Sequence, residues 1–226
     1  MNKTVIVAGS SGLIGTSVCN HLENNGWEVK KVDYQIGHDL TNEKFVKSYF
    51  KENKANGLIN LFALNHHITQ ESSQTNLFDV SIESFRKYME VNLTALFSTC
   101  REYARNNEEG SIVNFSSTYG VVSPRLDLYT NEEKHIGYTV SKTGVLGLSR
   151  HLAIHLAPKF RVNTIIPGGV KNNQTQAFLE MYSKNTPMKR MMNVKEINNI
   201  VEFLVSNKSS YMTGSEIKVD GGWTSW

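Results

Sequence analysis

Short runs of β-branched and other apolar residues alternate with longer segments of helical periodicity along the chain. The runs cover residues 4–7, 28–32, 58–62, 111–115 and 161–166. This alternation is typical of a parallel sheet with helices packed on both faces. We therefore predict an α/β fold with a doubly wound parallel sheet, and we expect about seven strands in all.

Three helical segments are the clearest. One begins near Ser81, another begins near Asn193, and a third covers residues 138–156. Asn193 and Glu196 have the spacing of a capping box, with Asn in place of Ser or Thr. The predicted inward face of the first helix consists of Ile82, Phe85, Met89, Leu93, Leu96 and Cys100.

Two polar stretches, residues 65–79 and 121–137, fit no regular element. Loops of this length in a compact domain usually carry function or move. We therefore treat both as candidates for the functional site.

Length and charge limit the kind of protein. The chain has 226 residues and no repeat or Pro/Ser-rich linker, which predicts a single domain over residues 1–226. Its 24 Lys and Arg and 21 Asp and Glu give a net charge of +3, too balanced for a polyanion-binding surface, so we expect no nucleic-acid partner. The longest apolar runs fall far short of the roughly 18 to 20 residues that span a bilayer, so we expect no membrane partner.

The cellular compartment and metal binding are also predicted from a few residues. The N-terminus lacks the apolar stretch and cleavage site of a signal peptide. Cys19 and Cys100 lie in predicted helices and do not form a disulfide framework, which favours a reducing cytoplasmic location. Adjacent His66 and His67 project differently and have no Cys or carboxylate cluster beside them, so we predict no metal site.

The first predicted strand leads directly into Gly9-Ser10-Ser11-Gly12-Leu13-Ile14-Gly15, and a helical stretch follows to about Asn24. Glycine permits positive φ and close approach of a phosphate to the backbone, while a helix N-terminus offers unpaired N–H groups. The spacing differs from the usual Gly-x-Gly-x-x-Gly fingerprint of dinucleotide binding. The loop therefore indicates a pyrophosphate site, and its alternative is a turn that only packs a helix against a strand.

Asp33 stands at the end of the second predicted strand, 18 residues after Gly15. This is near the spacing of about 20 residues expected for the acid that binds the ribose hydroxyls of NAD. Because a carboxylate repels a 2′-phosphate, we expect NAD to be favoured over NADP. Asp33 could instead be a solvated strand-end residue, and an inward-pointing Lys31 could partly reverse the preference.

Several further motifs follow in a fixed order. They are His38-Asp39-Leu40-Thr41, Asn92 within Val91-Asn92-Leu93, the strand at residues 110–117 that ends in Ser117, Tyr138-x-x-x-Lys142, Arg161-Val162-Asn163, Pro167-Gly168-Gly169 and the tail from Tyr211 to Asp220-Gly221-Gly222. This ordered series resembles the short-chain dehydrogenase/reductase family over essentially the whole chain. The resemblance implies a Rossmann-type fold and hydride transfer between NAD(H) and a small-molecule alcohol or ketone, in a homodimer or homotetramer.

The resemblance also implies roles for individual residues. The implied catalytic residues are Asn92, Ser117, Tyr138 and Lys142. The implied cofactor-binding residues are Gly9, Ser11, Gly12, Leu13, Ile14, Gly15, Asp33, Asp39, Leu40, Ala63, Tyr138, Lys142, Pro167, Gly168 and Val170. In the family, the lysine also holds the nicotinamide ribose, and the asparagine helps to position a water behind it.

The chemistry of the same residues supports these roles. Tyr138 and Lys142 lie four positions apart, which places them on one face of a helix. A nearby ammonium is expected to lower the pKa of the tyrosine so that it exchanges protons near neutrality. Ser117 can hydrogen-bond the substrate oxygen. The alternatives are an ordinary amphipathic pair for Tyr138 and Lys142, a turn residue for Ser117 and a buried helix-bonded side chain for Asn92.

The chain departs from the family at three places. Asn60-Leu61-Phe62-Ala63 stands where Asn-Asn-Ala-Gly is usual, and Asn172 replaces a threonine that contacts the nicotinamide carboxamide. Ser117 and Tyr138 are 21 residues apart, so the segment between them carries an insertion beside the site. The insertion resembles those of members from bacterial surface-sugar and flagellin-glycan pathways, which implies a sugar or nucleotide-sugar substrate.

The insertion at residues 121–137 is expected to form one wall of the substrate pocket. Arg125 and Lys134 could pair with a phosphate or carboxylate, and Tyr129 suits a sugar; solvated loop charges are the alternative. The terminal segment at residues 217–223 is expected to pack against a second subunit. A nucleotide-sugar epimerase or dehydratase, and a catalytically silent NAD-binding scaffold, are the alternative functions.

Overall fold

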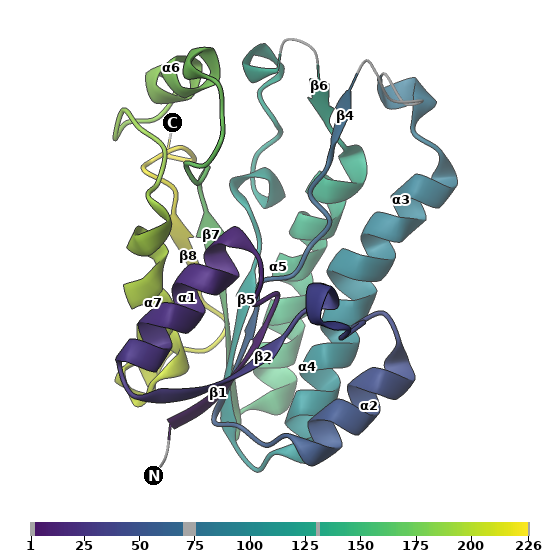
Figure 1. The fold of residues 1–226 in the computed structure, drawn as a ribbon, viewed down its shortest axis with the longest axis vertical. Helices are drawn as coiled ribbons and strands as arrows, with labels where there is room; N and C mark the ends of the chain where they lie inside the picture. Colours follow the sequence, from purple (N-terminus) through teal and green to yellow (C-terminus); the bar gives the residue numbers. More distant parts are fainter. Residues whose placement is uncertain (1–2, 70–75, 130–131, 226) are drawn as a thin grey trace.

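The computed structural model describes residues 3–69, 76–129 and 132–225, within which six strands form one parallel sheet (Figure 1). The strands are β1 (Lys3–Ala8), β2 (Trp27–Val32), β3 (Gly57–Asn60), β5 (Gly110–Phe115), β7 (Phe160–Pro167) and β8 (Glu216–Val219). Their order is β2-β1-β3-β5-β7-β8. Because β1 has β2 on one side and β3 on the other, the winding direction reverses there, which is where such sheets bind ligands.

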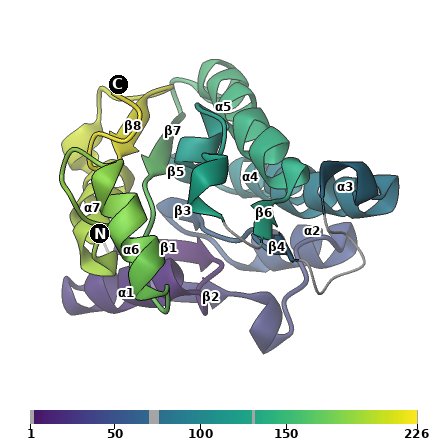
Figure 2. The same ribbon diagram turned by 90° about the horizontal axis from the view of Figure 1, so that it is seen from above.

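Helices cover both faces of the sheet, as predicted (Figure 2). Alternate residues of β1 point to opposite faces: Val5 and Val7 pack with α1 (Leu13–Asn24) and α7 (Asn198–Val205). Ile6 and Ala8 pack with α2 (Glu43–Glu52), α4 (Ala95–Asn106) and α5 (Ile136–Leu156). All four β1 side chains are fully buried. This two-sided burial confirms the doubly wound α/β fold.

The expected number of about seven strands is wrong by one for the described residues. Only residues 33–42 connect β2 to α2, and they form a single 3-10 turn at Tyr34–Ile36. A parallel crossover needs a dozen or more residues, so this connection cannot hold a further helix and strand. As a result β2 is an edge strand of the sheet.

The helix predicted to begin near Ser81 does so, but one residue of its predicted inward face, Ile82, is exposed. The Ser81 side chain accepts a hydrogen bond from the backbone N–H of Ser84 at the start of α3 (Ile82–Met89). A π-helical turn at Glu90–Thr94 joins α3 to α4. Because such a turn adds a residue to the helical repeat, it rotates α3 relative to α4. Ile82, the first residue of α3, is 66% exposed instead of inward-facing, whereas Phe85 and Met89 are half-buried and Tyr88 is buried.

The two polar stretches contain short regular elements that the sequence did not predict. The described part of residues 65–79 contains β4 (His67–Thr69), and the described part of residues 121–137 contains a 3-10 turn (Leu126–Leu128) and β6 (Glu132–Lys134). Strands β4 and β6 pair in antiparallel fashion, above the carboxyl ends of the main strands in Figure 1. The two stretches thus form one structure; residues 70–75 and 130–131 lie outside the described part.

The predicted capping box and the helical placement of the two cysteines agree with the structure. The capping box of Asn193 and Glu196 is present, at a 3-10 turn that leads into α7. Cys19 and Cys100 are free and buried, in α1 and α4. None of the described helices is long and apolar enough to cross a membrane.

Candidate active site

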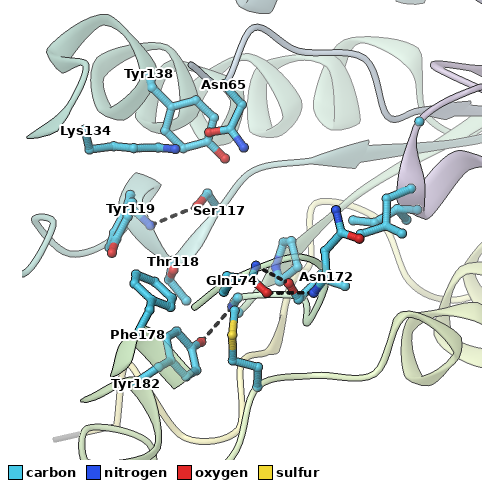
Figure 3. Close-up of a pocket in the computed structure, with 18 of the residues that line it drawn as sticks. Asn65, Ser117, Thr118, Tyr119, Lys134, Tyr138, Asn172, Gln174, Phe178 and Tyr182 are labelled. Atoms are coloured by element: carbon cyan, nitrogen blue, oxygen red, sulfur yellow. Dashed lines mark hydrogen bonds between the residues drawn. The ribbon is translucent and has the colours of Figure 1, made fainter. Parts of the chain in front are cut away.

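The carboxyl ends of β1, β5 and β7 border a pocket of about 640 Å³ (Figure 3). Ten of the predicted site residues line it: Gly9, Gly12, Leu13, Ile14, Gly15, Ser117, Tyr138, Pro167, Gly168 and Val170. Seven others are not in its lining: Ser11, Asp33, Asp39, Leu40, Ala63, Asn92 and Lys142. The fold therefore brings the glycine loop and the catalytic candidates Ser117 and Tyr138 to one cavity.

The glycine loop packs closely against neighbouring backbone only because its glycines lack side chains. Gly9 has a φ of +88°, and a Cβ on it would lie 2.4 Å from the backbone N of Phe62. A Cβ on Gly15 would lie 2.0 Å from the carbonyl oxygen of Gly9. Gly12 precedes α1, and no side chain caps that helix end. A close-packed turn below an uncapped helix N-terminus fits the pyrophosphate of a dinucleotide.

Asp33 is buried against this loop, not solvated. Its carboxylate accepts hydrogen bonds from the backbone N–H groups of Ser11, at 3.0 Å, and Gln35, at 2.9 Å. Lys31 instead forms an ion pair with Glu23 at 2.8 Å. Asp33 therefore supports the glycine loop at the end of β2, and Lys31 is engaged elsewhere.

Asp39 and Leu40, two of the predicted cofactor-binding residues, follow the 3-10 turn after β2. Asp39 accepts hydrogen bonds from the backbone N–H and the hydroxyl of Thr41, at 2.9 and 2.7 Å. Leu40 is buried in the core, and Ala63 is half-buried beyond the end of β3. Their contact with a cofactor stays a prediction.

Ser117, Tyr138 and Lys142 come from two adjacent elements. Ser117 follows β5, and its Oγ accepts a hydrogen bond from the backbone N–H of Tyr119 at 3.1 Å (Figure 3). Tyr138 and Lys142 lie one turn apart on α5. The Lys142 Nζ donates to the carbonyl oxygen of Phe115, at 2.8 Å, and lies 5.8 Å from the centroid of the Tyr138 ring.

Burial dominates the proton affinities of this pair. It raises the pKa of Tyr138, although the neighbouring Ser117 hydroxyl lowers it in part. Burial also lowers the pKa of Lys142 to about 8. The expected lowering of the Tyr138 pKa by Lys142 is therefore not found in this structure, because removal of the tyrosine from water has the larger effect. The Lys142 ammonium is bound to a strand carbonyl.

The buried side chain of Asn92 connects three segments of the chain by hydrogen bonds. Its amide oxygen accepts from the backbone N–H of Leu64, at 2.7 Å. Its amide nitrogen donates to the Leu64 carbonyl, at 3.1 Å, and to the Ser141 hydroxyl, at 3.0 Å. The π-helical turn, the segment after β3 and helix α5 are thus held together beside the pocket. Asn92 makes these bonds to other segments, unlike the helix-bonded side chain considered as an alternative.

The insertion does form a wall of the pocket, but not with both of its expected cations. Tyr129 and Lys134 line the cavity, and the Tyr129 hydroxyl hydrogen-bonds the Tyr119 hydroxyl at 2.8 Å. The Lys134 Nζ lies 4.7 Å from the centroid of the Tyr138 ring. Arg125 is half-exposed, pairs with Asp127 at 3.0 Å and is absent from the lining.

Aromatic residues of the opposite wall were missed by the sequence analysis. Phe178 and Tyr182 lie on α6 (Gln176–Lys184), and the Tyr182 ring stacks on Trp223 with centroids 4.7 Å apart. The Tyr182 hydroxyl accepts a hydrogen bond from the backbone N–H of Gly169, at 2.6 Å. Trp223 is only 5% exposed within its own chain, so this aromatic has a role without a second subunit. A signal was present in the apolar spacing of residues 178, 179 and 182.

Asn172, expected to replace a threonine, does line the pocket. Its backbone N–H donates to the side-chain oxygen of Gln174 at 2.7 Å, and the Gln174 amide nitrogen donates to the Val170 carbonyl at 3.0 Å. Gln174 thus fixes the turn after the Pro-Gly motif. Among the described residues, no group of three or more His, Cys, Asp or Glu side chains is placed to hold a metal ion.

Known proteins are similar to this chain in sequence and fold over nearly its whole length. A family model described as enoyl-(acyl carrier protein) reductase matches residues 14–224. The post-translational flagellin modification protein A of Campylobacter coli is 27% identical, covering 98% of each chain. The 3-oxoacyl-(acyl-carrier-protein) reductase FabG of Buchnera aphidicola subsp. Baizongia pistaciae is 30% identical, covering 98% of this chain and 87% of that protein.

Among solved structures, a short chain dehydrogenase from Leptospira borgpetersenii with bound NAD+ has a TM-score of 0.87 and 30% identity, over 99% of this chain and 93% of that one. The match extends from the glycine loop to the last strand. The chain therefore belongs to the short-chain dehydrogenase/reductase family of NAD(P)-dependent oxidoreductases.

Proposed function

We propose that this protein interconverts a secondary alcohol and a ketone with NAD(H) as the hydride carrier. The observation that carries the proposal is the pocket itself, because one cavity is lined by the glycine loop, Ser117 and Tyr138, with Lys142 one helical turn behind the tyrosine. A bound nicotinamide supplies the hydride acceptor or donor in this chemistry.

Each of the four candidate catalytic residues then has a defined role. Ser117 hydrogen-bonds the substrate oxygen and orients it toward the Tyr138 hydroxyl. Tyr138 gives its proton to the oxygen during reduction, or takes it during oxidation. Lys142 supplies positive charge next to the resulting tyrosinate, and Asn92 positions Leu64 and α5 around the site.

NAD is proposed over NADP because of Asp33. Its carboxylate stands at the end of β2 beside the glycine loop, where it disfavours a 2′-phosphate and can accept from a free ribose hydroxyl. The nearest cation on β2, Lys31, is paired with Glu23 and does not offset this charge.

A sugar or nucleotide sugar is the proposed substrate, because the insertion resembles those of members from surface-sugar and flagellin-glycan pathways. One relative of the chain is named for the modification of flagellin. The Tyr129 ring and the polar side chains of Asn65 and Gln174 line the pocket and suit a polyhydroxylated molecule. We also propose that the chain self-associates through the face that bears β8, which is the edge strand of the sheet at the C-terminal end.

The test is Tyr138→Phe, assayed by nicotinamide absorbance on a panel of sugars, nucleotide sugars and simple ketones. The change removes one proton-carrying oxygen and little volume, so kcat is expected to fall by about 10²- to 10⁴-fold. NADH affinity, measured by fluorescence titration, is expected to stay within about twofold. Tyr211→Phe is the matched control because Tyr211 is fully exposed.

Near-native turnover by Tyr138→Phe would mean that another group exchanges the proton. Binding of NADH without turnover of any compound by the wild-type protein would favour the catalytically silent scaffold. Turnover that releases no net reduced cofactor would favour an epimerase.

A further inference from the structure

We infer that His135 is a positioning residue that holds the first turn of α5, and with it Tyr138, in place only while its imidazole ring is neutral. The inference rests on the proposed function, because Tyr138 is the residue that exchanges the proton in that proposal. It gives a role to a buried titratable side chain that stands three residues before the tyrosine and takes no part in the proposed proton transfer.

His135 caps the helix that carries Tyr138. Its Nδ1 accepts a hydrogen bond from the backbone N–H of Gly137 at 2.9 Å. Its carbonyl oxygen accepts one from the backbone N–H of Tyr138, also at 2.9 Å. The N–H groups in the first turn of a helix have no partner further along the helix and need such acceptors. The ring and the main chain of one residue therefore hold the turn that contains Tyr138.

The imidazole ring is itself held by α3. Its Nε2 lies 2.9 Å from the Ser84 hydroxyl, and the ring stacks on Tyr88 with the centroids 4.2 Å apart and the planes 12° apart. A Cβ on Gly137 would lie 2.8 Å from the Cβ of Tyr88, so the start of α5 approaches α3 this closely only with glycine there. His135 is 4% exposed. The side chain thus joins the two helices at the end of α5 that carries the tyrosine.

These partners require one tautomer of the neutral ring. The backbone N–H of Gly137 can only donate, so Nδ1 must be unprotonated and the ring proton is on Nε2, where it is donated to the Ser84 hydroxyl. A second proton, on Nδ1, would point at the Gly137 N–H. It would also add a positive charge at a helix N-terminus, where the helix dipole opposes it. Protonation of His135 therefore breaks the cap of α5.

Burial lowers the pKa of His135 from its ordinary value of 6.5. The titratable groups of the described segments that meet around the ring are Tyr88, Tyr138, Glu83, Lys87, Glu133, Lys134 and His66, the last bound through its backbone by the Tyr88 hydroxyl. Glu83 and Lys87 are exposed on α3. As the pH falls through 6.5, an opened turn takes up a proton that the capped turn does not, so acid favours the opened turn.

The experiment follows the amide hydrogens of Gly137 and Tyr138 by hydrogen exchange between about pH 5 and 8, with and without NADH. Exchange is resolved to single amides by mass spectrometry, and each rate is divided by the intrinsic rate at that pH to give a protection factor. The variants are His135→Asn, whose side-chain oxygen caps a helix without titrating, and His135→Ala, which cannot cap it. His151→Asn, at an exposed position on the same helix, is the control.

In the wild type and in the control, protection of both amides is expected to fall by about tenfold from pH 7 to pH 5, because a histidine released from the cap is protonated over this range. His135→Asn is expected to stay within about threefold of the wild type at pH 7 and to lose the pH dependence. His135→Ala is expected to lose about fivefold at every pH, the effect of a missing cap. For any compound of the sugar and ketone panel that is turned over, the acidic loss of kcat is expected to be smaller in His135→Asn than in the wild type.

Protection that is constant from pH 7 to pH 5 in the wild type overturns the inference, and so does an equally large acidic loss in His135→Asn. If the variants do not fold, nitrogen NMR of the wild-type ring decides, because a neutral ring with its proton on Nδ1 is incompatible with the cap. Failure of the proposed function has a different signature: the wild-type protein would bind no NADH or transfer no hydride to any compound, whatever the state of the turn.

Discussion

The buried charge of Lys142 is expected to lower the free energy of unfolding of the protein. The substitution that tests this is Lys142→Met, which keeps the length of the side chain and removes the charge. In the fold, Lys142 is 5% exposed, and burial lowers its pKa from 10.5 to about 8. At about 1.36 kcal/mol per pKa unit, holding the proton on the buried amine at pH 7 costs about 3 kcal/mol of folding stability.

The sign of the pH dependence follows from proton binding. Between pH 8 and 10.5 the unfolded chain keeps the lysine proton and the native chain has released it, so stability rises with pH. The penalty is therefore fully present below pH 8 and is relieved as the pH approaches 10.5. Lys142→Met removes the penalty and also loses the hydrogen bond to the Phe115 carbonyl, worth about 1 kcal/mol.

Lys142→Met is thus expected to be about 2 kcal/mol more stable than the wild type at pH 7, with the gain falling to near zero by pH 10. Urea unfolding of the protein without cofactor, at several pH values between 7 and 10, measures this difference. The exposed Lys44→Met is the control, and its stability is expected to follow the wild type at each pH. A Lys142→Met protein less stable than the wild type at pH 7, or a difference independent of pH, would refute the reasoning.

Three further outcomes are expected. Gly15→Ala should lower NADH affinity at least tenfold and cost about 1 to 3 kcal/mol of stability, because its Cβ meets the Gly9 carbonyl. The control is Gly147→Ala on α5, which has open space around it and should lower neither NADH affinity nor stability. Calorimetry should show tighter binding of NAD(H) than of NADP(H), with Asp33→Ala reducing that ratio about tenfold; equal affinities in the wild type would remove Asp33 from this role. Sedimentation should find a dimer or tetramer at micromolar concentration, and a stable monomer would contradict self-association.

The parts of the fold that follow local rules could be predicted from the sequence. The strand-to-helix turn with Gly9 and Gly15 was predictable because side chains collide with the backbone at both positions. The placement of Tyr138 and Lys142 on one face of α5 was predictable, because a helix puts residues four positions apart on the same face. The capping box at Asn193 and the alternation of strands and helices belong to the same class, since neighbours in sequence determine them.

Features that depend on distant contacts were not predictable. The π-helical turn at Glu90–Thr94 is joined by Asn92 to Leu64 and Ser141, and neither contact leaves a local signal. The number of strands in the sheet was overestimated by one, because the ten residues between β2 and α2 hold no further helix and strand. The proton affinity of Tyr138 was misjudged because spacing on a helix gives the distance to Lys142 and not the degree of burial.

The two lysines beside Tyr138 are supported by different parts of the fold. Lys142 is buried and bound to the carbonyl of Phe115, the last residue of a central strand, so it cannot follow changes in the pocket wall. Lys134 is on a two-stranded ribbon built from the two polar loops, outside the main sheet. Changes in those loops can therefore alter the charge and shape of the pocket while the Ser117, Tyr138 and Lys142 geometry remains supported by β5 and α5. Sequence alone shows both loops, but their significance depends on the pairing of β4 with β6, which brings the Lys134 side chain to the tyrosine.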